Sequence, residues 1–402
     1  MLLGLPKNKT LVFSVLLALG ILLGAFQNCA PGFSSADLQS TAPDILDNSG
    51  NNPPTGIIKK SYIYVGGSSS IKALILDHKT DQITNVISYP LSSGQSPGWF
   101  DYDKISRTLF VADASGPNLN VLHLTEASGN LTLQKTLPFI SQAVHIQALR
   151  NNSDFSILAA SYNQGQYASY KVDFLGEAAT EQQVFTYASG AHSHSSSFDK
   201  GRNLVFVANK DEHRIVIYSR DIDGQLTHVG ATLVGDPRMV VYDEIFDKVY
   251  LTTEANTGHS SVVIYNIQEN AGVYSLIEAQ AFEMGLRGSD LKIDHKHGYV
   301  AATVREAGKE GIWALPVTSA GLFDMARMNK FIPVASKEAR SLAITTDGQY
   351  YVVTCNSGQN TSDLLIYKIS YDSSTNISAS DLIQEIDLGA GGFQSHYVLS
   401  VE

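Results

Sequence analysis

From Ser61 to the C-terminus, short apolar runs alternate with polar turns. The clearest unit pairs two apolar runs across a turn rich in Asp, Asn or Gly, as in SPGWFDYDKISRTLFVAD, which begins at Ser96. Runs of this length with alternating apolar and polar positions predict β-strands joined as antiparallel hairpins. The sequence therefore predicts an all-β domain over residues 59–402.

This hairpin unit recurs along the domain. Six copies end at Asp113, Ser161, Asn209, Glu254, Val304 and Cys355, with spacings of 48, 48, 45, 50 and 51 residues. A third apolar run, such as RIVIYS, follows each copy, and then a weaker fourth one. Four strands repeated at this period are typical of the blades of a β-propeller.

A seventh copy, SYIYVGGSSSIKALILD from Ser61, lacks its first strand, whereas the strand-like segment Ser395–Val401 belongs to no unit. We expect the C-terminal strand to complete the first blade, because this leaves no open sheet edge. The prediction is a seven-bladed β-propeller with four antiparallel strands per blade, closed by the C-terminal strand. A six-bladed ring or an open sandwich is the alternative.

The first residues have the pattern of an export signal. Lys7 and Lys9 precede an uncharged apolar run, residues 11–26, and Cys29 follows it closely. The run is shorter than the roughly 20 residues of a membrane span. Cys29 resembles the lipidation site of bacterial lipoproteins. An uncleaved signal anchor, or an ordinary signal peptide with a chance cysteine, is the alternative.

We therefore expect a signal peptide in residues 1–28 and a lipidated Cys29 at the start of a flexible tether, residues 29–58. The tether is rich in Pro, Ser, Asn and Gly and lacks a periodic apolar face. The expected location is the bacterial cell envelope, in the periplasm or at the outer membrane. Contact with the membrane is expected through the N-terminal lipid only, and the protein is expected to be a monomer.

The net charge excludes one class of partner. The formal charge is -11 at pH 7, and an acidic surface repels a phosphate backbone, so no nucleic acid partner is expected. The two cysteines, Cys29 and Cys355, cannot form a disulfide framework, and no zinc-ligand spacing occurs. No cofactor is expected.

The hairpin pattern predicts where a site would lie. The start of the first strand and the end of the second meet on one rim of the ring, 16 positions apart, as for Arg238 and Glu254. The polar residues of this rim are His145, His192, His194, Arg238, Arg287 and Arg340 on the first strands, and Asp113, Tyr162, Asn209, Glu254 and Arg305 on the second.

Many His and Arg residues with few carboxylates predict an anion-binding pocket that contains an acid/base group. Because arginines outnumber carboxylates, the same set argues against a metal site. Two structural interpretations stay open at this point. Arg238 and Glu254 could be an ion pair between strands, and the histidines could be hydrogen-bonded fillers of the channel.

Four segments carry a family resemblance. AHSHSSSFDKGRNLVFVANKDEHRIVIY, PRMVVYDEIFDKVYLTTE, VREAGKEGIW and KEARSLAITTDGQYYVVTCN resemble the lactonase family of seven-bladed propellers, which includes a bacterial 6-phosphogluconolactonase and a fungal carboxymuconate cyclase. The resemblance extends from Ser61 to the C-terminus. It implies active-site roles for His192 or His194, Arg238, Glu254 and Arg305. Ala191 and Ala339 stand where the family has proline, and Val304 where it has asparagine.

The first functional hypothesis is hydrolysis of a small anionic lactone. Glu254 or one of the paired histidines would activate water, and Arg238 or Arg305 would stabilise the oxyanion or hold an anionic group. His145, Arg287, Arg340, Asp113 and Asn209 are the further candidates for substrate binding. No GxSxG motif for a covalent nucleophile occurs. The rival hypothesis is a non-catalytic envelope propeller that binds a ligand or a protein partner.

Lipidation can be tested by metabolic labelling with a fatty acid. The wild type should incorporate label and Cys29→Ser should not, because the thiol is the expected attachment point. Equal labelling of both proteins would contradict the lipoprotein interpretation.

Overall fold

A computed structural model describes residues 59–125, 128–175, 177–187, 192–334, 338–356, 362–388 and 397–401 of the chain. The predicted signal peptide, Cys29 and the tether lie outside these residues and stay predictions. The described part contains no helix of the length and apolar character needed to cross a bilayer.

The described residues form 28 strands, which occupy four positions from the channel outward. The innermost strands are β28 (Tyr397–Val401), β4 (Pro97–Asp103), β8 (Ala143–Arg150), β12 (Ser193–Asp199), β16 (Pro237–Asp243), β20 (Gly288–Asp294) and β24 (Glu338–Ile344). The second strands are β1 (Lys60–Gly67), β5 (Thr108–Asp113), β9 (Asp154–Ser161), β13 (Leu204–Asn209), β17 (Lys248–Thr253), β21 (Tyr299–Val304) and β25 (Tyr350–Asn356).

The third strands are β2 (Ser70–Asp77), β6 (Asn118–Thr125), β10 (Gln166–Asp173), β14 (Arg214–Arg220), β18 (Ser260–Asn270), β22 (Gly311–Pro316) and β26 (Ser362–Tyr371). The outermost strands are β3 (Gln82–Pro90), β7 (Asn130–Pro138), β11 (Ala179–Thr186), β15 (Leu226–Leu233), β19 (Val273–Gly285), β23 (Lys330–Pro333) and β27 (Ile377–Asp387).

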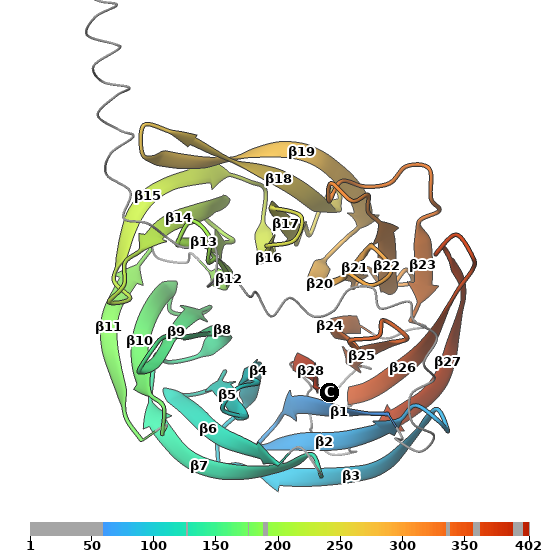
Figure 1. Cartoon of the computed structure of the whole chain (residues 1–402), viewed down its shortest axis with the longest axis horizontal. Helices are drawn as coiled ribbons and strands as arrows, with labels where there is room; N and C mark the ends of the chain where they lie inside the picture. The colour runs from blue at the N-terminus through green and yellow to red at the C-terminus, as the bar shows by residue number, and fades with distance from the viewer. Residues whose placement is uncertain are drawn as a thin grey trace, which may run out of the picture. The chain divides into compact units, whose positions relative to one another are not determined.

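These strands make seven antiparallel blades arranged around a central channel (Figure 1). Blade 1 has the order β28-β1-β2-β3, and blades 2 to 7 follow in chain order from β4 to β27. The predicted all-β, seven-bladed propeller is confirmed. Within blade 1, β28 pairs with β1 from Tyr62↔Val401 to Gly66↔Tyr397, so strands from both ends of the propeller share one sheet. That this pairing stabilises the ring stays a prediction.

Blades 4 and 5 are joined at their outer edges. A single parallel pairing, Gly230↔Tyr274, connects β15 to β19 and merges the two blades into one eight-stranded sheet. A Cβ atom on Gly230 would lie 1.8 Å from the carbonyl oxygen of Tyr274. Only glycine permits this approach of the two backbones.

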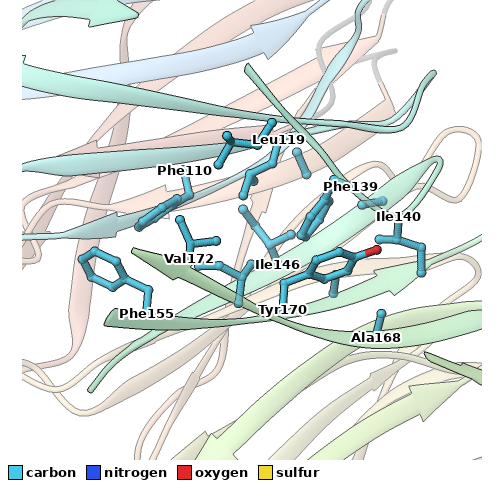
Figure 2. Close-up of a cluster of buried hydrophobic side chains, with 14 of the residues drawn as sticks. Phe110, Leu119, Phe139, Ile140, Ile146, Phe155, Ala168, Tyr170 and Val172 are labelled. Carbon is cyan, nitrogen blue, oxygen red and sulfur yellow. The ribbon is translucent and has the colours of Figure 1, made fainter. Parts of the chain in front are cut away.

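The hydrophobic core lies between neighbouring blades. Figure 2 shows one such layer, in which Phe110 of β5 meets Phe155 of β9 with ring centroids 5.0 Å apart. Strands in the second position are covered on both sides by adjacent blades, and every residue of β9 is buried. This explains why these strands appear in the sequence as continuous apolar runs rather than alternating ones.

Six innermost strands begin with the same irregularity. Their register with the second strand shifts between Pro97 and Trp99 in blade 2, and at the matching place in blades 3 to 7. Such a β-bulge leaves a residue outside the ladder and redirects its side chain. The displaced residues are Gly98, Val144, His194, Arg238, Ser289 with Asp290, and Arg340. We call the end of the channel where they lie the mouth face, and the opposite end the far face.

On the far face, carboxylates at the ends of innermost strands connect successive blades. Asp103 accepts a hydrogen bond from Arg150 Nε of the next blade at 2.9 Å. Asp243 Oδ2 lies 2.8 Å from His295 Nε2 of the next blade. These aspartates also accept backbone amides of their own turns, so each one fixes a turn and a blade contact together.

Removal of residues 397–401 should lower the melting temperature, because blade 1 loses its innermost strand and the buried Val398 and Tyr397. Each kcal/mol lost should lower the melting temperature by less than the roughly 2–4 °C typical of smaller domains, because the unfolding entropy grows with chain length. Ser400→Ala is the matched control, since its buried hydroxyl has no hydrogen-bond partner among the described residues. A truncated protein that melts like the wild type would rule out closure by this strand.

Candidate active site

A cavity of about 300 Å³ opens on the mouth face. It is lined by bulge residues and by residues that directly follow the second strands. The lining consists of Gly98, Trp99, Ala114, Val144, Tyr162, His194, Arg238, Met239, Glu254, Ser289, Asp290, Arg305, Arg340 and Ser341. The bulges explain the composition of this pocket, because in blades 4 to 7 they turn one or two polar side chains towards the channel.

The bulges also decide which neighbours meet. Counted from the bulge residue, the spacing of 16 positions joins Gly98 to Ala114, and Arg238 to Glu254. Asp113, one position earlier than Ala114, lies inside the strand instead. The sequence-based count therefore took Asp113 where the lining residue is Ala114.

Glu254 is the centre of the strongest electrostatic cluster in the pocket. Its Oε2 accepts a hydrogen bond from Arg238 Nη1 at 2.5 Å and lies 3.0 Å from Lys210 Nζ. Its Oε1 accepts a hydrogen bond from Arg305 Nη2. The three cations come from blades 4, 5 and 6. The predicted pair of Arg238 and Glu254 is therefore part of a network that spans three blades.

This network fixes the protonation state of Glu254. Burial alone would raise the pKa of the carboxyl, but Arg238, Arg305 and other neighbouring charges lower that pKa well below its usual 4.5. The carboxylate is thus ionised at neutral pH and is a weak proton acceptor. Burial and the charge of Arg238 lower the pKa of Arg305 to about 9, so Arg305 stays protonated at neutral pH.

The two histidines of the HxH segment occupy different places. His194 lines the pocket, and burial together with Arg238 lowers its pKa well below 6.5, so its ring is neutral at pH 7. His192 is not among the lining residues. Its ring stacks on that of Tyr162, with the ring centroids 3.9 Å apart, and its Nδ1 makes a hydrogen bond with Asp211 Oδ2. Because both rings contact Tyr162, His192 supports one wall of the pocket from outside.

The remaining arginines share a second carboxylate. Arg340 lines the pocket and donates to Glu338 Oε2 at 3.1 Å. Arg287 is not a lining residue, and its Nη1 lies 2.8 Å from Glu338 Oε1. These five cationic side chains thus share two carboxylates. In the pocket lining itself, the three arginines outnumber the two carboxylates, Glu254 and Asp290.

Three predicted binding residues lie away from the lining. Asp113 Oδ1 accepts hydrogen bonds from the backbone amides of Ser96 and Ser115, both at 2.9 Å, and so organises a turn. Asn209 is buried and donates to Glu212 at 3.0 Å. His145 is buried beneath Trp99, and burial lowers its pKa to about 3, so it is a neutral part of the channel filling.

A polar floor was not anticipated from the sequence. Asp290 lines the pocket. Its Oδ2 accepts a hydrogen bond from Ser341 Oγ at 2.8 Å, and its Oδ1 lies 2.9 Å from Lys292 Nζ. Trp99, also a lining residue, stacks on Tyr397 of β28 at 3.8 Å. No local motif marks these residues, because they come from four separate blades, 1, 2, 6 and 7.

One arrangement resembles a hydrolytic triad but lies elsewhere. Ser61 Oγ is 2.7 Å from His78 Nε2, and His78 Nδ1 is 3.2 Å from Asp347 Oδ2. Ser61 is fully buried at the far-face end of β1, so its hydroxyl cannot reach a substrate in the pocket. The triad is a structural link between blades 7 and 1.

Within the described ranges, no three His, Cys, Asp or Glu side chains converge as metal ligands. The pocket instead offers guanidinium donors for an anion, a neutral imidazole as a proton acceptor, and a floor of hydroxyls and a carboxylate. These groups suit the binding and polar chemistry of a small anionic molecule.

The structure thus defines a β-propeller of four-stranded blades with a pocket at the mouth of its channel. The chain belongs to the lactonase family: the family description "Lactonase, 7-bladed beta-propeller" matches residues 58–379. No curated protein matches the chain.

Solved structures show the same fold at low sequence identity. A putative 6-phosphogluconolactonase from Bacteroides fragilis is 15% identical, with a TM-score of 0.69 over 87% of this chain and 100% of that one. The periplasmic gluconolactonase of Pseudomonas aeruginosa is 15% identical, with a TM-score of 0.68 over 86% of this chain and 99% of that one. A putative 6-phosphogluconolactonase from Bacteroides uniformis is 17% identical, with a TM-score of 0.66 over 85% of this chain and 99% of that one.

Glu254→Gln should destabilise the protein, because it leaves three cations without their shared carboxylate. Loss of one partner from a buried ion pair costs about 3–5 kcal/mol. The lowered pKa of Glu254 means that its contribution is present above the unfolded-state pKa and is lost as pH falls below about 4.5. The free energy of unfolding, measured with urea, should therefore fall more steeply between about pH 5 and 3 for the wild type than for Glu254→Gln. Parallel pH profiles would contradict this assignment.

Proposed function

We propose that this protein hydrolyses a small lactone that carries an anionic group, in the mouth-face pocket. The observation that carries the proposal is the cationic excess around His194, in a lactonase-family chain whose net charge is -11. An acidic protein with a cationic pocket confines its attraction for anions to that one site.

Hydrolysis of a lactone needs a proton acceptor and an oxyanion partner. Neutral His194 takes a proton from water as the water oxygen attacks the carbonyl carbon. Arg238 or Arg305 donates hydrogen bonds to the oxyanion that forms. The ring C–O bond then breaks, and the protonated imidazole returns its proton to the departing alkoxide, which yields a hydroxy acid.

The arginines and Glu254 have separate tasks in this scheme. Glu254 holds Arg238 and Arg305 in place rather than acting as the base, because its cation partners keep it ionised and weakly basic. Arg340 is the donor for the anionic group of the substrate, since its planar fork matches a carboxylate or phosphate.

We further propose that the protein is exported and held at the cell envelope through Cys29, as its N-terminal sequence predicts. The Pseudomonas aeruginosa relative is described as periplasmic, so an exported setting has a precedent in this fold. An exported enzyme would meet lactones that reach the envelope.

A screen of the purified protein against neutral, carboxylated and phosphorylated lactones in a pH-stat tests the activity. His194→Ala should lower kcat roughly 10²–10⁴-fold, as expected for a lost general base. His192→Ala is the matched control and should mainly raise KM, because His192 supports Tyr162 from outside the pocket. The wild-type rate should persist below pH 6.5 and fall only in stronger acid, where His194 becomes protonated.

Arg238→Lys should lower the rate although its charge is kept, because an ammonium group cannot reproduce the bidentate donors of a guanidinium. Turnover that survives both His194→Ala and Arg238→Lys would place the chemistry elsewhere. A wild type that binds anions in the pocket but hydrolyses no lactone would instead support the rival hypothesis of a non-catalytic binding protein at the cell envelope.

A further inference from the structure

The exposed apolar side chains of the propeller are concentrated on its far face. Eight large hydrophobic residues in the described part are at least 60% exposed. Seven of them lie on far-face turns or at the far-face start of an outer strand: Ile105, Leu175, Ile222, Ile245, Val273, Met325 and Met328. The eighth, Leu233, ends β15 on the mouth face.

The strand directions place these residues without ambiguity. In every blade the second and fourth strands run from the far face to the mouth face, and the third strand runs back. The turns β4–β5, β10–β11, β14–β15, β16–β17, β18–β19 and β22–β23 therefore all lie on the far face. The seven residues come from blades 2 to 6, so they form an arc of separate apolar tips, which we call the far-face tips.

The chain enters the propeller on this same face. Lys59, the first described residue, pairs with Asp347 at 2.6 Å, and Asp347 belongs to the far-face turn between β24 and β25. Residues 1–58, which carry the apolar run and Cys29, therefore connect to the propeller at the far face. Any attachment to a bilayer through these residues therefore starts from the far face, and not from the face that carries the pocket.

We infer that the far-face tips insert into the lipid surface and hold the propeller with its pocket facing away from the membrane. A protein interface usually needs a contiguous apolar core. These tips instead come from separate blades with polar residues between them, and a planar, deformable bilayer surface can accept each tip on its own. This contact adds to the lipid at Cys29, the only membrane contact expected from the sequence.

The charges of the far face indicate how the contact would respond to salt. Exposed lysines such as Lys79, Lys104 and Lys296 alternate with acidic residues such as Asp223 and Glu244. With both signs present, apolar insertion rather than attraction to anionic lipid supplies the contact. Protection of the tips should therefore persist at high salt, where surface electrostatics are screened.

The experiment uses the full chain, reconstituted into phosphatidylethanolamine/phosphatidylglycerol vesicles, with an environment-sensitive fluorophore on a single introduced cysteine. Ile222→Cys reports on a tip, and Leu233→Cys, equally exposed, reports on the mouth face. The unsubstituted chain, labelled in parallel, gives the signal from Cys29 and Cys355. The label at position 222 should be quenched by nitroxide lipids and protected from aqueous iodide, and the label at position 233 should show the reverse.

A second variant separates insertion from simple proximity. Replacement of Ile105, Met325 and Met328 by serine should restore iodide access at position 222 without changing the melting temperature, because these side chains are exposed. Equal iodide access at positions 222 and 233 in the unsubstituted background would overturn the inference. So would protection at position 222 that appears only at high protein density, since that would assign the face to a second copy of this chain.

Discussion

The channel mouth depends on a constraint of the backbone: each of six innermost strands departs from its ladder just where it begins. A regular strand would alternate its side chains between the two neighbouring blades, and nothing polar would point along the channel. The bulge breaks this alternation and directs His194, Arg238 and Arg340 into a common space. The ring can therefore carry a site without altering the apolar layers between its blades.

Charge balance limits which of these residues can do chemistry. Glu254 is surrounded by cations from three blades, so its charge stabilises the arrangement of the blades as much as it shapes the pocket. A carboxylate with so low a pKa is a poor base, whereas a neutral imidazole beside it keeps a free lone pair at neutral pH. The network thus favours His194 as the proton acceptor and Glu254 as the residue that positions the arginines.

The sequence predicted the blades well because each repeats a local pattern of apolar runs and turns. The same repeat placed Arg238 and Glu254 at one end of their hairpin, and the two side chains are paired there. It could not show the bulges, and a displacement of one residue separates Asp113 from Ala114 and His145 from Val144. Lys210, Trp99 and Asp290 were missed because each contacts a residue of another blade, namely Glu254, Tyr397 and Ser341. No spacing within a unit records a contact between blades.

The two faces of the ring differ in what fixes them, and this difference bears on function. Far-face turns are tied to one another by pairs such as Asp103 with Arg150, so they present a rigid plane. The mouth face gathers its charges around an open cavity instead, where a ligand can add the missing anion. A propeller held to a bilayer by its far face would keep that cavity open to the aqueous phase. Anionic substrates would then reach the arginines without first crossing the negative surface potential of the membrane.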